Sequence, residues 1–179
     1  MSPDDIFDIF YAFDQDAEGG FYNDPNAGPT MRGILQSTYN DWLKANGLPA
    51  ADVRNITDDQ VRAIIYQMFW AAPHIDLIAA VAPATSVAVA DFGENIGDTR
   101  PIKALQRRIG APTVDGIIGT RTVSALHAAI ANAGGDLAFT KIYNDDRAAW
   151  YRMHSPAADI VGLENRVERM NAYLREKFA

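Results

Sequence analysis

The sequence reads Ser2-Pro3-Asp4-Asp5-Ile6-Phe7-Asp8-Ile9-Phe10-Tyr11-Ala12-Phe13 near its beginning, and this stretch indicates the class of the fold. Serine is a favoured helix N-cap, proline suits the first helical position, and acidic residues are favoured in the first turn. Large apolar residues then recur at helical spacing, namely Ile6, Ile9, Phe10 and Phe13. The pattern ends at Gly19-Gly20. The sequence therefore predicts an amphipathic helix at the start of a mainly α protein.

Similar signals follow along the chain. Residues 21–29 are rich in turn formers and predict a loop, with at most a short irregular hairpin. A helix is then expected to carry Ile34, Thr38 and Trp42 on one side and to end near Asn46-Gly47. Thr57-Asp58-Asp59-Gln60 is a capping box. The buried stripe behind it is expected to comprise Val61, Ile64, Ile65, Met68 and Phe69.

The most apolar stretch, residues 77–90, gives an ambiguous signal. Val87 and Val89 alternate as in a strand, whereas the alanine content and the length favour a buried helix. Its 14 residues are too few to span a membrane. Four more helices are expected, with inward residues Ile102, Leu105 and Ile109; Val123, Leu126 and Ile130; Phe139, Ile142, Tyr143 and Trp150; and Leu163, Val167, Met170 and Leu174. The loop at residues 93–100 suggests two packed regions, 1–95 and 96–179.

Composition excludes several classes of function. The 179 residues contain no cysteine, so disulfides, thiolate metal sites and cysteine nucleophiles are absent. The net charge of −7 disfavours general binding to nucleic acid or to anionic membranes. The acidic start, Ser2-Pro3-Asp4-Asp5, differs from the basic start of a secretory signal. No phosphate-binding glycine loop, G-x-G-x-x-G, G-x-S-x-G or H-E-x-x-H pattern occurs, so neither a metal nor a cofactor is expected.

Two groups of charged residues merit attention. Arg100, Lys103, Arg107 and Arg108 fall near one helical face, which is either a solvated surface or a contact for an anionic ligand. Glu18 directly precedes Gly19-Gly20, whose uncovered backbone would let a substrate approach closely. A partly buried glutamate at such a loop suits a general acid. The alternative is a helix-end glutamate followed by a glycine C-cap, although a glutamate there opposes the helix dipole.

Three groups of residues around Glu18 resemble the signature of a known family. They are Glu18-Gly19-Gly20-Phe21, Asn23-Asp24-Pro25 and Gly28-x-Thr30-x-x-Gly33-Ile34. In their order and spacing they resemble the N-terminal region of glycoside hydrolase family 108, small lysozyme-like N-acetylmuramidases that are common as phage and prophage endolysins. Tyr66-x-x-x-Trp70 and Asp91-Phe92-x-x-Asn95-x-Gly97 resemble later motifs of the family. Leu105-Gln106 and Asp115-Gly116-Ile117-Ile118-Gly119 resemble the predicted peptidoglycan-binding module that usually follows.

The resemblance implies a lysozyme-like helical domain with a packed C-terminal helical module. It also implies hydrolysis of the β-1,4 bond between N-acetylmuramic acid and N-acetylglucosamine, with Glu18 as general acid. Asp24 is the candidate second carboxylate, and Thr30 is the candidate holder of the attacking water. The structural alternatives are that Asp24 only forms a turn and that Thr30 only caps the start of a helix.

Further residues are candidates for binding the substrate. Asp91, Asn95 and Gly97 either form a cleft wall that hydrogen-bonds sugar amides or satisfy backbone groups near a loop. Tyr66 and Trp70 either stack on sugar rings or belong to the core. Asn26 lies in the loop that replaces the family's D-P-G-G with Asn26-Ala27-Gly28-Pro29, and this loop is shorter than in the family.

The shortened loop motivates one competing hypothesis, a catalytically impaired cell-wall-binding or phage structural protein on the same fold. Another is a lytic transglycosylase, which forms an anhydro product, and a generic helical interaction module remains as background. The expected partner is bacterial peptidoglycan, and the expected state is a monomer without membrane insertion. We expect synthesis in the cytoplasm without a signal peptide, and action on the cell wall after release or from a phage particle.

Overall fold

The computed structural model describes residues 1–17, 19–25, 28–97 and 99–179. Helices dominate this part of the chain: α1 (Pro3–Ala17), α2 (Gln36–Ala45), α3 (Asp58–Tyr66), α4 (Ile75–Ala79), α5 (Pro83–Ile96), α6 (Arg100–Arg108), α7 (Thr120–Ala133), α8 (Asp136–His154) and α9 (Ile160–Phe178). Two short segments add a 3-10 turn, η1 (Val53–Asn55), and a π-helical turn, η2 (Gln67–Ala71). The predicted mainly α, lysozyme-like fold is confirmed.

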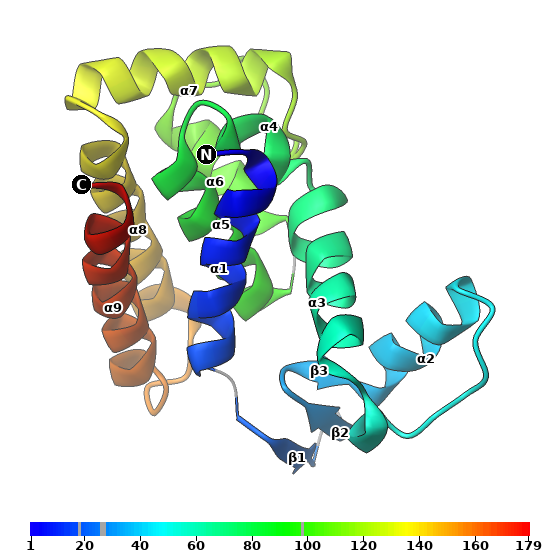
Figure 1. The fold of residues 1–179 in the computed structure, drawn as a ribbon. Coiled ribbons are helices and arrows are strands. Elements are labelled where there is room, and N and C mark those ends of the chain that lie inside the picture. The colour runs from blue at the N-terminus through cyan, green and yellow to red at the C-terminus, as the bar shows by residue number, and fades with distance from the viewer. Residues whose placement is uncertain (18, 26–27, 98) are drawn as a thin grey trace.

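A small antiparallel sheet stands where the sequence suggested at most an irregular hairpin. Its strands are β1 (Phe21–Asp24), β2 (Gly28–Met31) and β3 (Ile34–Leu35), in the order β1-β2-β3. The sheet and α2 lie at one end of the molecule, beyond the C-terminal end of α1, as Figure 1 shows. Much of the segment that follows α1 therefore forms strands of a sheet beyond the end of that helix.

Helix α5 lies at the centre of the fold. It contacts α1, α4, α6, α8 and α9, and every residue from Ala84 to Phe92 is buried. A helix that is covered on all sides has no polar face, which explains why its sequence lacked a clear period. The hydrophobic core is one cluster that extends from Ile6 to Leu174 and includes residues of both predicted regions. The boundary between residues 95 and 96 stays a prediction.

Helix α2 buries a different face from the predicted one. Its buried residues are Tyr39 and Leu43, whereas Thr38 and Trp42 are half-buried and Ile34 belongs to β3. The Tyr39 hydroxyl donates a hydrogen bond to Gln60 Oε1 (2.9 Å), so this tyrosine is buried with its polar group satisfied.

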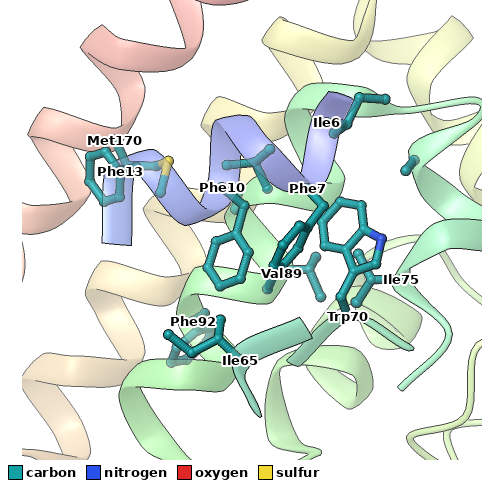
Figure 2. Close-up of a cluster of buried hydrophobic side chains, with 14 of the residues drawn as sticks. Ile6, Phe7, Phe10, Phe13, Ile65, Trp70, Ile75, Val89, Phe92 and Met170 are labelled. Carbon is teal, nitrogen blue, oxygen red and sulfur yellow. The ribbon is translucent and has the colours of Figure 1, made fainter. Parts of the chain in front are cut away.

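The capping box and the start of its helix are as predicted. Thr57 and Gln60 form the reciprocal capping bonds, and Val61, Ile64 and Ile65 are buried. The predicted stripe then fails, because Met68 is 44% exposed while Trp70 is fully buried. The π-helical turn η2 adds a residue to the turn and thereby rotates Trp70 into the core. Figure 2 shows Trp70 packed against Phe7 and the neighbouring core residues.

The C-terminal half follows the predicted helices. Of the residues predicted to point inward, Ile142 is 40% exposed, while Trp150 is half-buried and packs against the core and its neighbour Tyr151 is fully buried. Helices α8 and α9 pack against each other along one side of the molecule (Figure 1). In the part of the chain that the structure describes, no helix combines the length and apolar character needed to cross a membrane.

Candidate functional site

Two of the predicted site residues, Glu18 and Asn26, lie outside the described residues. The structure does describe their surroundings on both sides. Helix α1 ends at Ala17, and β1 begins at Phe21. The candidate site is therefore built from the end of α1, the Gly19-Gly20 segment and the three strands.

Arg32 ties the sheet to α1. It occupies the turn between β2 and β3 with a positive φ of 51°, and Gly33 follows with a φ of 78°. Two consecutive positive φ angles define the tight turn that suits a twisted hairpin. The Arg32 Nε and Nη2 atoms donate to Gln15 Oε1 at 3.0 and 2.6 Å, and its Nη1 forms an ion pair with Asp58. The sheet is thus attached to α1 three positions before Glu18.

The two faces of the sheet have different surroundings. Directly paired residues share a face, so Phe21, Met31 and Ile34 lie on one face, while Tyr22, Thr30 and Leu35 lie on the other. Ile34 is buried, and Met31 packs against the core. We call the second face, formed by Tyr22, Thr30 and Leu35, the outward face.

Thr30 and Asp24 therefore occupy distinct places in the sheet. Thr30 is half-buried on the outward face, in the middle of β2. This position argues against the helix N-cap interpretation, because α2 begins only at Gln36. Asp24 is the last residue of β1 and pairs with Gly28 across the sheet. The structure thus places both in the same small sheet beyond the end of α1.

Trp70 requires a correction. Its side chain is fully buried, with its ring 5.6 Å from that of Phe7 and 6.2 Å from that of Phe10 between centroids. A ring enclosed in this way offers no face to a sugar, so Trp70 is a core residue. Tyr66 is half-buried and meets Phe7 edge-on at 4.9 Å. It also lines a surface pocket between α2 and α3, so the structure does not bring it together with Thr30.

Asp91 also requires a correction, because it is fully buried. Its carboxylate forms ion pairs with Arg147 Nη1 and Arg166 Nη2, each at 2.6 Å. Burial alone would raise the pKa of Asp91, but the two guanidinium charges outweigh it and hold that pKa below its ordinary value. A carboxylate that is enclosed by two arginines in the interior organises the fold and does not form a cleft wall.

Asn95 and Gly97 have structural partners as well. Asn95 Oδ1 accepts a hydrogen bond from the Tyr151 hydroxyl (3.0 Å), which ties α5 to α8. Gly97 has a φ of 67° and caps the end of α5 in the left-handed conformation that favours glycine. Both observations agree with the structural alternative for this motif.

Arg166 joins the end of α1 to the C-terminal half. Besides Asp91, its Nη2 lies 3.4 Å from Asp14 Oδ1 and 3.3 Å from Glu94 Oε2. Asp14 is fully buried and stands one helical turn before Glu18. Sequence reasoning missed Asp14 and Glu94. A signal existed for Asp14, since it stands four residues after Phe10, on the buried face of the first helix.

The loop at residues 115–119, which belongs to the predicted wall-binding module, is held by hydrogen bonds to Gln106. Gln106 donates from Nε2 to Asp115 Oδ1 (2.8 Å) and accepts at Oε1 from the Gly116 backbone N–H (2.8 Å). Gly116 has a φ of 82°, and a Cβ there would stand 3.0 Å from Lys103 Cε. Glycine is therefore required at this position for the turn itself, which agrees with a structural role for the motif.

The described ranges hold no cluster of three or more His, Asp or Glu side chains arranged for a metal ion.

Two arginines of the basic face of α6 have partners on α8. Arg108 forms an ion pair with Asp146, and the Arg100 guanidinium lies 5.2 Å from the ring centroid of Trp150.

The chain is similar to a solved structure and to one family of enzymes. It aligns with the "Structure of Brucella abortus SagA" at a TM-score of 0.75 and 23% identity, over 97% of this chain and 95% of that chain. At this identity the likeness shows the fold alone. A search of curated proteins finds no match. The family model described as Glycosyl hydrolase 108 matches residues 13–97, a region that contains Glu18, Asp24 and Thr30, and this similarity supports a glycoside hydrolase.

Proposed function

We propose that this protein is a peptidoglycan hydrolase of the N-acetylmuramidase type. It would cleave the β-1,4 bond between N-acetylmuramic acid and N-acetylglucosamine in bacterial peptidoglycan. The observation that carries the proposal is the match of residues 13–97 to the glycosyl hydrolase 108 model, which includes every candidate catalytic residue. The sheet that holds Thr30 and Asp24, attached to α1 through Arg32, supports it.

In the proposed mechanism, Glu18 is the general acid. It donates its proton to the glycosidic oxygen while an oxocarbenium-like centre develops on the sugar. To carry that proton near neutral pH, Glu18 would need apolar surroundings, as general acids of this kind do. Thr30 would hold the attacking water from the outward face of the sheet. Asp24 is the carboxylate that would stabilise the centre or activate that water.

Two further features belong to the proposal. The protein would act as a monomer on the cell wall, after release from the cytoplasm or from a phage particle. The net charge of −7 does not favour long-range attraction to the anionic stem peptides, and two of the α6 arginines are engaged by Asp146 and Trp150. Capture of the substrate would therefore depend on contacts within the cleft and on a local basic face such as that from Arg100 to Arg108.

The test is digestion of purified peptidoglycan by the wild type and by Glu18→Gln, with mass spectrometry of the products. Glu168→Gln, an exposed substitution of the same kind on α9, is the matched control. We expect reducing N-acetylmuramic ends from the wild type and from Glu168→Gln, and none from Glu18→Gln. Anhydro ends would instead identify a lytic transglycosylase. Folded protein that pellets with the wall and releases no products would identify a binding or structural protein.

A further inference from the structure

Gly19 and Gly20 are both exposed, and neither their backbone conformation nor the packing of the described residues requires glycine there. Neither glycine has a positive φ, so the backbone conformation does not demand glycine at either position. A Cβ added at either position would meet no described atom within 4 Å, so packing does not demand glycine either. Bare backbone in this situation is what a closely approaching ligand requires.

An exposed aromatic ring stands beside this segment. Tyr22 is 58% exposed, and it lies on the outward face directly opposite Thr30. Phe21, its neighbour in β1, is also exposed (47%), but it lies on the opposite face of the sheet, where the Arg54 guanidinium lies 5.6 Å from its ring centroid. The two adjacent aromatic rings therefore lie on opposite faces of the sheet, and only the ring of Tyr22 shares a face with Thr30.

The chemistry of this surface suits a sugar ring. A tyrosine ring offers an apolar face for the C–H groups of a pyranose and a hydroxyl for its polar edge, and its few rotatable bonds make the ordering cost small. The Thr30 hydroxyl, as the cross-strand neighbour of Tyr22, adds a donor and acceptor on the same face. Single exposed aromatics are common, so the inference depends on the coincidence of three features: bare backbone, an outward ring and an adjacent hydroxyl.

We propose that Gly19-Gly20, Tyr22 and Thr30 form a binding surface for one N-acetylated pyranose of the glycan strand, with Tyr22 as its stacking residue. The inference rests on the proposed function and names the residue that holds the substrate over the site. Tyr22 acts here as a binding residue, and it takes no part in the proton transfer.

The test compares Tyr22→Leu with Phe21→Leu, since each change removes one aromatic ring of the same strand and keeps apolar bulk. Binding is measured by pelleting with purified sacculi in the Glu18→Gln background, and turnover of sacculi is measured in the otherwise wild-type protein. We expect Tyr22→Leu to weaken binding and to raise KM about three- to tenfold, with kcat and the melting temperature little changed. Tyr22→Trp should restore binding, and Phe21→Leu should bind as the parent does.

A second variant tests the bare backbone. Gly20→Ala should leave the melting temperature unchanged, because the free protein has room for the methyl group, yet it should weaken binding to sacculi. Equal binding by Tyr22→Leu, Gly20→Ala and the parent would overturn the inference, even if the wild type digests peptidoglycan. Absence of products from the wild type would overturn the proposed hydrolase instead, while the pelleting assay would still report on the surface.

Discussion

Arg32 combines an unfavourable backbone conformation with a role that no smaller residue fills. Its φ of 51° places it in the left-handed region, which costs a residue with a Cβ about 1–2 kcal/mol. Its guanidinium meanwhile holds Gln15 of α1 and Asp58 of α3. Asp58 is exposed, so the bonds to Gln15 are the more substantial attachment. The conformational cost at this residue is thus balanced by the contact that places the sheet.

We predict that Arg32→Gly separates stability from activity. Glycine relieves the left-handed strain, and this gain offsets the loss of hydrogen bonds that contribute about 1 kcal/mol each. The melting temperature should therefore stay within about 3 °C of the wild type, while kcat falls at least about tenfold because the sheet loses its attachment to α1. Arg32→Ala, which keeps the strain and loses the bonds, should be less stable. Full activity of Arg32→Gly would show that other contacts place the sheet.

Asp91 has its effect through charge in the interior. Replacement of Asp91 by Asn should destabilise the protein by about 3–5 kcal/mol near neutral pH, because Arg147 is fully buried and would keep an uncompensated charge. The depressed pKa of Asp91 means that its contribution is fully present above the ordinary value of 3.8 and is lost as the pH falls through the folded-state value. Urea unfolding should therefore show a constant difference between wild type and Asp91→Asn from about pH 5 to 7 that narrows below about pH 4. A difference that widens in acid would contradict this account.

At the scale of the elements, the N-terminus of α3 offers a direct comparison. Thr57 caps α3 through its side chain, whereas Thr99, at the N-cap position of α6, makes no such bond. Thr57→Ala should lower the free energy of unfolding by about 1 kcal/mol, and Thr99→Ala should lower it by much less. Chemical denaturation of both variants measures the difference. Equal losses would mean that packing, and not capping, determines the stability of these helix starts.

The elements also show which signals a sequence carries. Capping residues and glycines act locally, so the start of α3 and the end of α2 were predictable from a few neighbouring residues. The π-helical turn η2 and the burial of Asp91 depend on distant partners. Arg166 stands 75 positions after Asp91, and no local period records their contact. The motif around Glu18 could be recognised because its residues are close together in the sequence. The roles of Trp70 and Asp91 depend on packing between distant segments, so only the structure showed them.

At the scale of the whole molecule, the C-terminal helices complete the region that matches the hydrolase family. Helix α5 contacts α6, α8 and α9, and Asp91 depends on arginines from α8 and α9. Helix α9 also reaches α1 directly, where the Tyr173 hydroxyl donates to the Ile9 carbonyl (2.9 Å) and Arg169 forms an ion pair with Asp16. The C-terminal half therefore stabilises the position of α1, the helix that precedes Glu18. This structural role does not depend on whether the C-terminal half binds the cell wall.

This dependence predicts that a fragment of residues 1–97 does not fold by itself. The fragment keeps the family-matched region, but it exposes the apolar faces of α5 that contact α6, α8 and α9 and lacks both arginines that pair with Asp91. Circular dichroism should show no cooperative melting, and the fragment should not digest peptidoglycan. Addition of a 98–179 fragment in trans should recover part of both properties, since the missing contacts are noncovalent. Cooperative melting of the 1–97 fragment alone would instead make the first half an independent domain, and digestion by it would assign the C-terminal half a role outside catalysis.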